Sequence, residues 1–346
     1  MEKNNERKLP KLDLNVTNRC NYRCNHCAFD SGEKKLDEMS LEKIVQILKE
    51  TKELGGEKFD ITGGEAIIRR DVPDIIAAGK DLGYKIELIS NGSLMTPEKI
   101  KLFKNLGLDS IAISLDGSDY EIHTITRTVS YEQYAKTLLA IENILANGIK
   151  LKINTAVSEA NYRNVPQLTE WCAENDVFEH GLYYFTPVGR GQAGLLKAIE
   201  PITWLKFIRE SLYDLGKEIK LSLEFPFIEK SLLKDGKLNG KNIECLAESE
   251  QYHLQILPDG NVYPCAIMAS YSNPLANLHE KSMAEIWQTK NVWDDYWKKS
   301  ADIFQKNNGC CVDFSSSFPK MDYSKYEFVC PLRKFYVEDV RELKVK

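Results

Sequence analysis

Between residues 11 and 190, short β-rich runs alternate with amphipathic stretches. The runs, rich in β-branched and aromatic residues, are Lys11–Thr17, Lys58–Thr62, Lys85–Ser90, Ser110–Leu115, Lys150–Val157 and Gly181–Thr186. The stretches with helical periodicity are Ser40–Leu54, Val72–Leu82, Pro97–Leu106, Tyr131–Asn147 and Val165–Asn175. Successive β-α units build parallel sheets, and right-handed crossovers curl such a sheet. We therefore expect an α/β fold with a partial (β/α)6 TIM-like barrel.

Polar and glycine motifs follow the ends of these runs. They are Cys20, Gly63-Gly64-Glu65, Asn91-Gly92, Asp116-Gly117 and Gly189-Arg190, while Asn154 lies within the fifth run. In parallel α/β folds, active sites gather at the carboxyl ends of the strands. The sequence therefore predicts one site at this rim of the barrel.

The regular alternation of predicted strands and helices does not continue after residue 200. Pro201–Leu215 predicts a helix with proline at its first position. A polar linker, Lys230–Lys241, precedes a hairpin around Pro258–Asn261, and the tail from Asn308 has little periodicity, so we expect metal ligation to hold it. We expect a flexible N-terminus (1–11), a core barrel (12–225) and a small C-terminal α+β auxiliary-cluster domain (226–346).

Charge and hydropathy limit the classes of function. The 346 residues carry a formal net charge of −5 with both signs mixed, which predicts binding to neither nucleic acid nor an anionic membrane surface. No run of 18 apolar residues is present, and the charged opening MEKNNERKLPK lacks the apolar core of a signal peptide. We expect a cytoplasmic protein, where clustered cysteines indicate metal ligands or reactive groups.

Three cysteines follow the first predicted strand. Cys20, Cys24 and Cys27 form a C-x3-C-x2-C pattern. Three thiolates from one loop hold three irons of a cubane and leave the fourth iron open for a substrate. The alternative is a zinc site with His26 or a distant cysteine as the fourth ligand.

A second motif favours an iron–sulfur cluster over a zinc site. Thr62-Gly63-Gly64-Glu65 follows the second strand, and with the cysteine loop it resembles the radical S-adenosylmethionine (radical SAM) superfamily over roughly residues 12–190. The resemblance implies that the Gly-Gly-Glu turn receives the methionine amino group, since glycines permit close approach and a carboxylate pairs with an ammonium. Ala66 and Ile67 depart from the Pro-Leu that many relatives carry there.

Further segments acquire roles from this resemblance. Ser114-Leu-Asp116-Gly117 is similar to a fourth-strand motif near the ribose, and Arg127 to an arginine that pairs with the ligand's carboxylate, although Thr124 replaces an aspartate in that segment. The cofactor-binding residues implied are Gly63, Gly64, Glu65, Asn91, Ser114, Asp116, Arg127, Asn154 and Gly189.

A second cysteine set occupies the C-terminal part. The spacing Cys245-x14-Gly260-x4-Cys265 resembles the opening of the SPASM and twitch extensions of the superfamily. These extensions carry auxiliary iron–sulfur clusters. Cys310, Cys311 and Cys330 complete the set, enough for one further four-cysteine cluster but not two. The alternative is a structural zinc. The metal ligands expected are Cys20, Cys24, Cys27, Cys245, Cys265, Cys310, Cys311 and Cys330.

Adjacent thiols rarely ligate one cluster, because successive side chains on an extended chain point in opposite directions. We therefore expect Cys311 to be the ligand and Cys310 to be a spare thiol. Near the substrate, that thiol would be a hydrogen-atom donor, a covalent anchor or an inert core residue.

The resemblance implies a mechanism. One [4Fe–4S] cluster reduces S-adenosylmethionine to give a 5′-deoxyadenosyl radical, which abstracts a hydrogen atom, and one auxiliary [4Fe–4S] cluster accepts an electron. The expected reaction is oxidation, cross-linking or epimerisation of a ribosomal peptide, as in a radical SAM oxidoreductase or peptide maturase. Oxidation of a small molecule, a tetrapyrrole side chain or a carbohydrate, is the alternative. A non-catalytic zinc-binding interaction protein is the alternative of another class.

The resemblance also implies partners. We expect an electron donor such as flavodoxin or ferredoxin. A peptide substrate would come with a separate peptide-recognition protein, because only about ten residues precede the first predicted strand.

Overall fold

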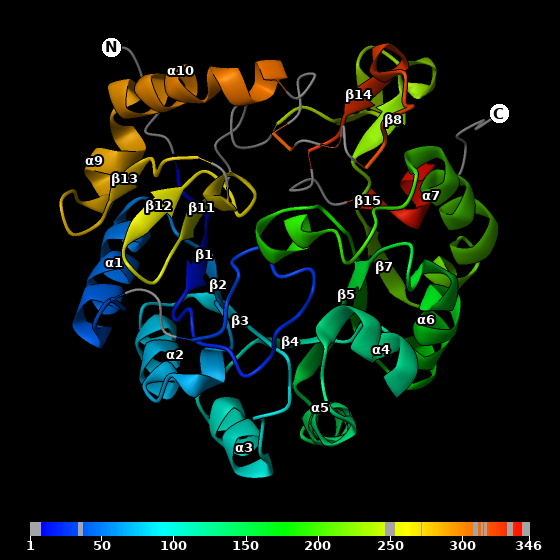
Figure 1. The fold of residues 1–346 in the computed structure, drawn as a ribbon. Helices are drawn as coiled ribbons and strands as arrows, with labels where there is room; N and C mark the ends of the chain where they lie inside the picture. Colours follow the sequence, from blue (N-terminus) through cyan, green and yellow to red (C-terminus); the bar gives the residue numbers. More distant parts are fainter. Residues whose placement is uncertain are drawn as a thin grey trace.

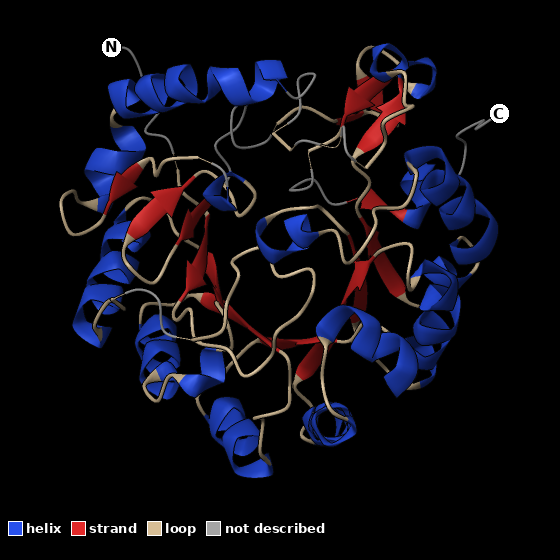
Figure 2. Ribbon diagram, viewed as in Figure 1, coloured by secondary structure: helices blue, strands red, loops and turns tan. Residues whose placement is uncertain are grey.

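The computed structural model describes residues 8–33, 37–245, 253–270, 272–306, 311–312, 314, 317–330 and 335–340. A curved parallel sheet forms its centre, with helices outside (Figures 1 and 2). Its strands in chain order are β1 (Lys11–Asn15), β2 (Lys58–Thr62), β3 (Lys85–Ser90), β4 (Ser110–Ser114), β5 (Lys150–Val157), β6 (Glu179–Tyr184) and β7 (Lys220–Leu223). The expected α/β partial barrel is confirmed.

Five helices outside the sheet begin and end close to the expected residues: α1 (Leu41–Glu53), α2 (Val72–Asp81), α3 (Pro97–Asn105), α5 (Tyr131–Ala146) and α6 (Val165–Glu174). The other two in this part of the chain are α4 (Tyr120–Arg127) and α7 (Pro201–Phe207), which ends before the expected Leu215. Ser40 caps α1 by accepting a hydrogen bond from the backbone N–H of Lys43. Pro201 opens α7, as the sequence predicts, but a π-helical turn follows from Ile208 to Leu212.

Two expectations along the barrel were wrong. The sixth strand begins at Glu179, two residues before the predicted start, because Glu179 pairs in register with Lys152 of β5 and with Lys220 of β7. Helix α4 was not predicted, since its eight residues are too few for a clear helical period.

The sheet continues beyond the barrel at both edges. Strand β11 (His253–Ile256) pairs parallel to β1, and β12 (Asn261–Tyr263) and β13 (Ala276–Asn277) continue from it antiparallel. This confirms the expected hairpin. At the far edge, β15 (Phe335–Tyr336) pairs with β7. Part of the tail therefore pairs with the sheet, while the expectation that metal ligation holds the tail stays a prediction.

Smaller elements complete the C-terminal region. Strand β8 (Phe227–Glu229) pairs with β14 (Tyr326–Phe328), and β9 (Lys237–Leu238) pairs with β10 (Lys241–Asn242) inside the segment expected to be a linker. Helices α9 (Met283–Gln288) and α10 (Lys290–Lys306) pack through Trp287 and Trp293, whose rings meet edge to face. In the described residues, no helix is long and apolar enough to cross a membrane.

Candidate active site

The Gly-Gly-Glu turn after β2 packs directly on the backbone that leads into the cysteine loop. Gly64 N–H donates to Thr17 O at 2.7 Å, and Glu65 N–H donates to Arg19 O at 2.8 Å. A Cβ on Gly63 would lie 2.4 Å from Thr17 O, and one on Gly64 would lie 2.2 Å from Arg19 O. Both positions therefore require glycine for the approach of two loops, a reason that the motif alone does not reveal.

The Glu65 carboxylate is fully buried and accepts three hydrogen bonds. Its donors are Ser90 Oγ at 2.9 Å, Asn91 N–H at 2.8 Å and Ile67 N–H at 3.2 Å. Burial raises the pKa of Glu65 above its usual value, and these hydrogen bonds partly oppose the rise. An ionised carboxylate has about four acceptor sites, and these donors use three of them.

Asn91, at the end of β3, connects the turn to the cysteine loop. Its Nδ2 donates to Asn21 Oδ1 at 2.9 Å, and its Oδ1 accepts from Ser93 N–H at 3.0 Å. Asn21 Nδ2 in turn donates to Ser93 Oγ at 2.9 Å. Asn91 is thus a link between two loops of the expected site.

The three thiols of the cysteine loop lie at the carboxyl end of β1. Cys24 and Cys27 are close enough to Cys20 to affect its pKa, which burial raises to about 12. Burial also raises the pKa of Cys24, to about 11, although Arg127 opposes the rise. Metal coordination deprotonates thiols of this kind.

The donor set fits an iron–sulfur cluster. A cubane takes one thiolate on each of three irons, so its ligands surround the cluster. The three thiols from one loop match that requirement.

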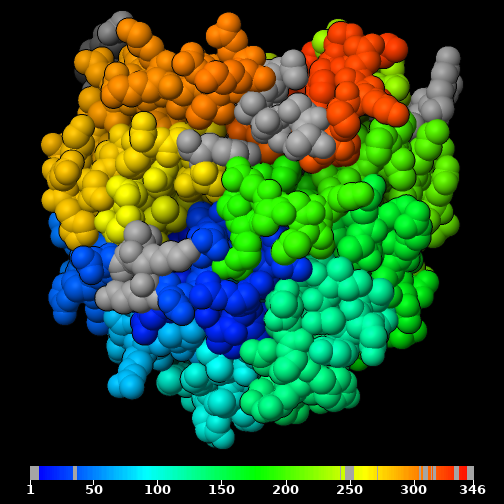
Figure 3. Space-filling model, in the orientation of Figure 1, coloured from blue at the N-terminus to red at the C-terminus, as the bar shows by residue number. Residues whose placement is uncertain are grey.

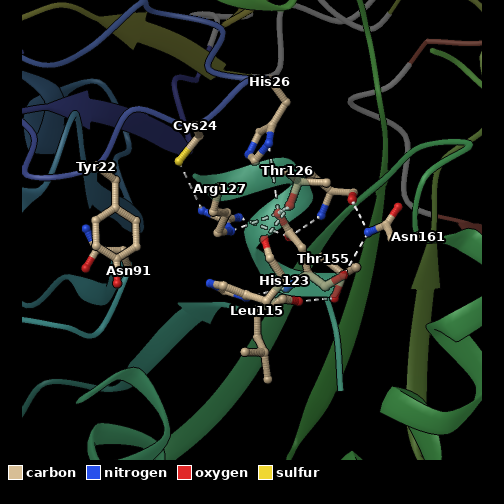
Figure 4. Close-up of polar contacts among 12 residues, drawn as sticks. Tyr22, Cys24, His26, Asn91, Leu115, His123, Thr126, Arg127, Thr155 and Asn161 are labelled. Atoms are coloured by element: carbon tan, nitrogen blue, oxygen red, sulfur yellow. Dashed lines mark hydrogen bonds and ion pairs between the residues drawn. The ribbon is translucent and has the colours of Figure 1, made fainter. Parts of the chain in front are cut away.

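Asp116 and Arg127 form a buried ion pair beside the loop (Figure 4). Arg127 Nε lies 2.8 Å from Asp116 Oδ2, and Asp116 also accepts from Thr126 Oγ1 at 2.7 Å and from Ala156 N–H at 2.9 Å. Burial alone would raise the pKa of Asp116, but Arg127 together with His26, His123 and the hydrogen bond from Thr126 outweighs burial, and the pKa falls to about 2. Arg127 Nη1 lies 3.9 Å from Cys24 Sγ.

Two ring nitrogens near this pair are buried without a hydrogen-bond partner among the described residues: His26 Nδ1 and His123 Nε2. Burial lowers the pKa of His26 to about 4 and that of His123 to about 3, so both rings are neutral at pH 7. Buried polar atoms normally have a partner. Their presence beside the loop fits a site that takes a polar ligand, as S-adenosylmethionine is.

The remaining predicted cofactor residues line the same rim. Ser114 of β4 and Asn154 of β5 pair in register and are both half-buried. Gly189, after β6, lies against the cysteine loop, where its Cβ would come within 2.1 Å of Ala28 O. The structure therefore brings seven of the nine predicted cofactor residues to the cysteine loop, while Ser114 and Asn154 lie side by side in β4 and β5.

The second thiol set gathers in the C-terminal region. Cys245 and Cys311 are close enough to Cys265 to raise its pKa further, although burial is the larger cause. Cys330 N–H donates to Ile243 O at 3.0 Å, which places Cys330 beside the segment that leads to Cys245. Cys310 lies outside the described residues.

The sequence analysis missed a polar layer inside the barrel. Lys11 Nζ lies 2.7 Å from both Asp13 Oδ1 and Asp60 Oδ2, and His253 Nε2 lies 3.3 Å from Asp13 Oδ2. The Tyr183 ring lies over Gly181, where a Cβ would come within 2.9 Å of it. The sequence pattern that indicates this polar layer is the alternation of polar and apolar residues in KLDLN and KFDIT.

Comparisons with known proteins agree with this arrangement. Residues 14–171 match the radical SAM superfamily, and residues 245–318 match the SPASM iron–sulfur cluster-binding domain. An α/β barrel with three thiols after its first strand defines a class of iron–sulfur enzymes that bind S-adenosylmethionine. The chain therefore contains a radical SAM domain (residues 14–171) followed by a C-terminal SPASM module (residues 245–318). The protein therefore uses a [4Fe–4S] cluster, S-adenosylmethionine and auxiliary iron–sulfur ligation.

Individual relatives are distant. The chain is 24% identical over 294 residues to an AdoMet-dependent heme synthase of Methanosarcina barkeri, covering 80% of this chain and 82% of the relative. SuiB of Streptococcus suis bound to S-adenosylmethionine has a TM-score of 0.68 at 17% identity, covering 83% of this chain and 68% of SuiB. Native anSMEcpe with bound AdoMet has a TM-score of 0.63 at 19% identity, covering 84% and 83%. Both structures share the fold.

Proposed function

We propose that the protein oxidises, cross-links or epimerises residues of a ribosomal peptide. One observation carries the proposal: segments next to the auxiliary thiols border the mouth of the barrel. Ile267 and Val312, close in sequence to Cys265 and Cys311, line a narrow apolar pocket with Tyr184 and Glu224 at the ends of β6 and β7. A substrate at this mouth would lie between the two thiol sets.

The proposal assigns a role to each group of site residues. Cys20, Cys24 and Cys27 hold one cluster, and Cys245, Cys265, Cys311 and Cys330 hold the other. When bound, these groups supply one-electron reduction of S-adenosylmethionine and an acceptor for the electron left on the substrate. Glu65 receives the methionine ammonium, Arg127 is held beside Cys24 by Asp116, and the C-terminal region excludes water.

Structures of similar proteins with bound peptides support a peptide substrate. One SuiB structure is bound to its precursor peptide SuiA, and one anSMEcpe structure holds the Cp18Cys peptide. In this proposal an electron donor such as flavodoxin or ferredoxin reduces the cluster, and a separate protein recognises the peptide.

The relative from Methanosarcina barkeri supports a second candidate, oxidation of a tetrapyrrole side chain, because the match covers most of both chains. The two candidates separate in one experiment. Reconstituted enzyme with dithionite and S-adenosylmethionine should release 5′-deoxyadenosine, faster when its substrate is present.

Peptides encoded by neighbouring genes and a porphyrin with propionate side chains are then added in parallel, and products are read by mass spectrometry. Modified peptide supports the first candidate and modified porphyrin the second. Absence of 5′-deoxyadenosine from fully loaded enzyme would contradict both.

A further inference from the structure

The segment after β6 returns to the cysteine loop and makes close contact with it. Gly189 has a φ of +53°, and a Cβ there would come within 2.1 Å of Ala28 O. The next residue, Arg190, donates its backbone N–H to Cys27 O at 2.9 Å. Glycine at 189 thus lets Arg190 lie directly against the loop.

Each nitrogen of the Arg190 guanidinium donates a hydrogen bond to that loop. Its Nη1 donates to Cys24 O at 2.9 Å, its Nη2 to Ser31 O at 2.6 Å, and its Nε to Asp30 Oδ1 at 3.0 Å. The side chain is 17% exposed. A rigid planar fork that spans the loop from Cys24 to Ser31 fixes the separation of these two backbone carbonyls.

Two arginines lie near Cys24, but their charges are balanced differently. The partner of Arg127, Asp116, has a fully buried side chain, whereas that of Arg190, Asp30, is 50% exposed. Water screens an exposed carboxylate more than a buried one. The positive charge of Arg190 is therefore less compensated by its carboxylate partner than that of Arg127.

We propose that Arg190 is a positioning residue that clamps the cysteine loop, and that its charge raises the reduction potential of the cluster held there. The inference rests on Cys20, Cys24 and Cys27 as the ligands, and is independent of the substrate. Reduction adds one negative charge to the cluster, and a nearby fixed cation stabilises that state.

Ser270 offers an uncharged contact with the same loop. It ends the short helix Met268–Ser270, just beyond Cys265, and its Oγ donates to Ala28 O at 3.1 Å. Ser270→Ala removes a hydrogen bond from the loop and changes no charge. It therefore separates the effect of loop geometry from the effect of charge.

The test is an EPR-monitored redox titration of the anaerobically reconstituted holoenzyme, together with its iron content. The signal that changes when S-adenosylmethionine is added identifies the relevant cluster. In Arg190→Gln, the equilibrium constant for one-electron reduction should fall about 10-fold, which corresponds to 59 mV. Arg190→Lys keeps the charge and should stay near the wild-type potential. Arg209→Gln, which removes a cation paired with Glu210, is the control.

Asp30→Asn provides an independent test of the charge effect if the Arg190 variants lose iron. Asp30 has a φ of +46°, which asparagine tolerates well, and the change removes the screening carboxylate. The potential should then rise. An unchanged potential in both Arg190→Gln and Asp30→Asn would overturn the proposal. A shift in Arg190→Lys or Ser270→Ala as large as that in Arg190→Gln would assign the effect to geometry and also overturn it.

Discussion

At the scale of single residues, Glu65 combines two tasks. Its carboxylate joins the turn after β2 to the end of β3 through Ser90 and Asn91, and in the proposed function it also receives the methionine ammonium. Backbone N–H donors fix the orientation of the carboxylate before any ligand arrives. A preorganised charge of this kind costs little reorganisation when the ligand binds.

We predict that Glu65→Ala weakens binding of S-adenosylmethionine by roughly 2–5 kcal/mol, because the methionine ammonium loses a buried charge partner. The unfolding midpoint should fall as well, since three buried donors lose their acceptor. Equilibrium dialysis with labelled ligand measures the first effect and thermal unfolding the second.

Glu65→Gln separates the two tasks, because an amide oxygen still accepts hydrogen bonds while the charge is gone. Its affinity should fall with a smaller loss of stability. Glu98→Ala, which removes an exposed carboxylate from the first turn of α3, should change neither. Unaltered affinity in both Glu65 variants would refute the ammonium assignment.

The sequence predicts residues of this site unevenly. The cysteine loop and Gly-Gly-Glu are local patterns, so spacing alone identifies them. The ion pair of Asp116 with Arg127 depends on α4, whose existence the sequence did not reveal. His26 was considered only as a zinc ligand, and its unpartnered nitrogen becomes evident only when Thr126 and Asp116 are in place around it.

At the scale of elements, the close approach of two loops limits what Gly63 tolerates. Its φ is +141°, and a Cβ would lie 2.4 Å from Thr17 O. We predict that Gly63→Ala displaces the start of the cysteine loop and lowers the iron held by Cys20, Cys24 and Cys27, measured by iron assay and by the EPR signal sensitive to S-adenosylmethionine.

Gly236→Ala is the matched control. Its φ is +70° and nothing lies within 4 Å of a Cβ there, so only the left-handed conformation is strained, by about 1–2 kcal/mol. Iron content should stay at the wild-type level. Equal iron loss in both variants would mean that backbone strain, and not the contact between loops, is responsible.

The polar layer between β1, β2 and β11 predicts a pH dependence of stability. Burial raises the pKa of Asp60, Lys11 opposes the rise, and the net value is about 7. A carboxyl group whose pKa is raised on folding stabilises the fold while protonated, so this stability declines as pH rises from about 4 to about 7. The slope reaches at most about 1.4 kcal/mol per pH unit.

Asp60→Asn should remove that decline in stability. The difference between the unfolding midpoints of the variant and the wild type should therefore change with pH across this range. His253, with its pKa lowered to about 4 by burial, acts in the opposite direction but cancels in the difference. Asp81→Asn, at an exposed position ending α2, should leave the decline intact. A difference that does not vary with pH would disprove the titration of Asp60.

At the scale of the whole molecule, one sheet connects the two thiol sets. Strand β11 pairs with β1, which leads into the cysteine loop, while β15 pairs with β7 at the far edge. Figure 3 shows the yellow surface that follows residue 250 beside the blue surface of the N-terminal part. The sequence predicted the barrel because each β-α unit is local. It did not predict these edge pairings, because they join strands far apart in the chain and the strands are short.

We expect the two cysteine sets to bind their iron–sulfur clusters independently of each other. We predict that anaerobically prepared protein holds about eight irons, as two [4Fe–4S] clusters. Changing Cys20, Cys24 and Cys27 together to alanine should remove about half of them, because the C-terminal thiols keep their own supports, including the Cys330 N–H bond to Ile243 O. Iron and zinc assays measure this outcome, and zinc in place of iron would refute it.

The last prediction concerns the adjacent pair Cys310 and Cys311. Cys311 is buried and close enough to Cys265 to raise its pKa, so it lies with Cys245 and Cys265. Successive side chains on an extended chain diverge, so one cubane should take only one of the pair. Cys311→Ala should therefore lose the auxiliary iron, about four atoms, and Cys310→Ala should retain it. Cys172→Ala, which removes a buried thiol from α6, is the control for general loss of a cysteine. If both single variants of the pair lose auxiliary iron, both thiols are required and the spare-thiol hypothesis fails. If Cys310→Ala keeps its iron but no longer turns over substrate, Cys310 acts in the reaction itself.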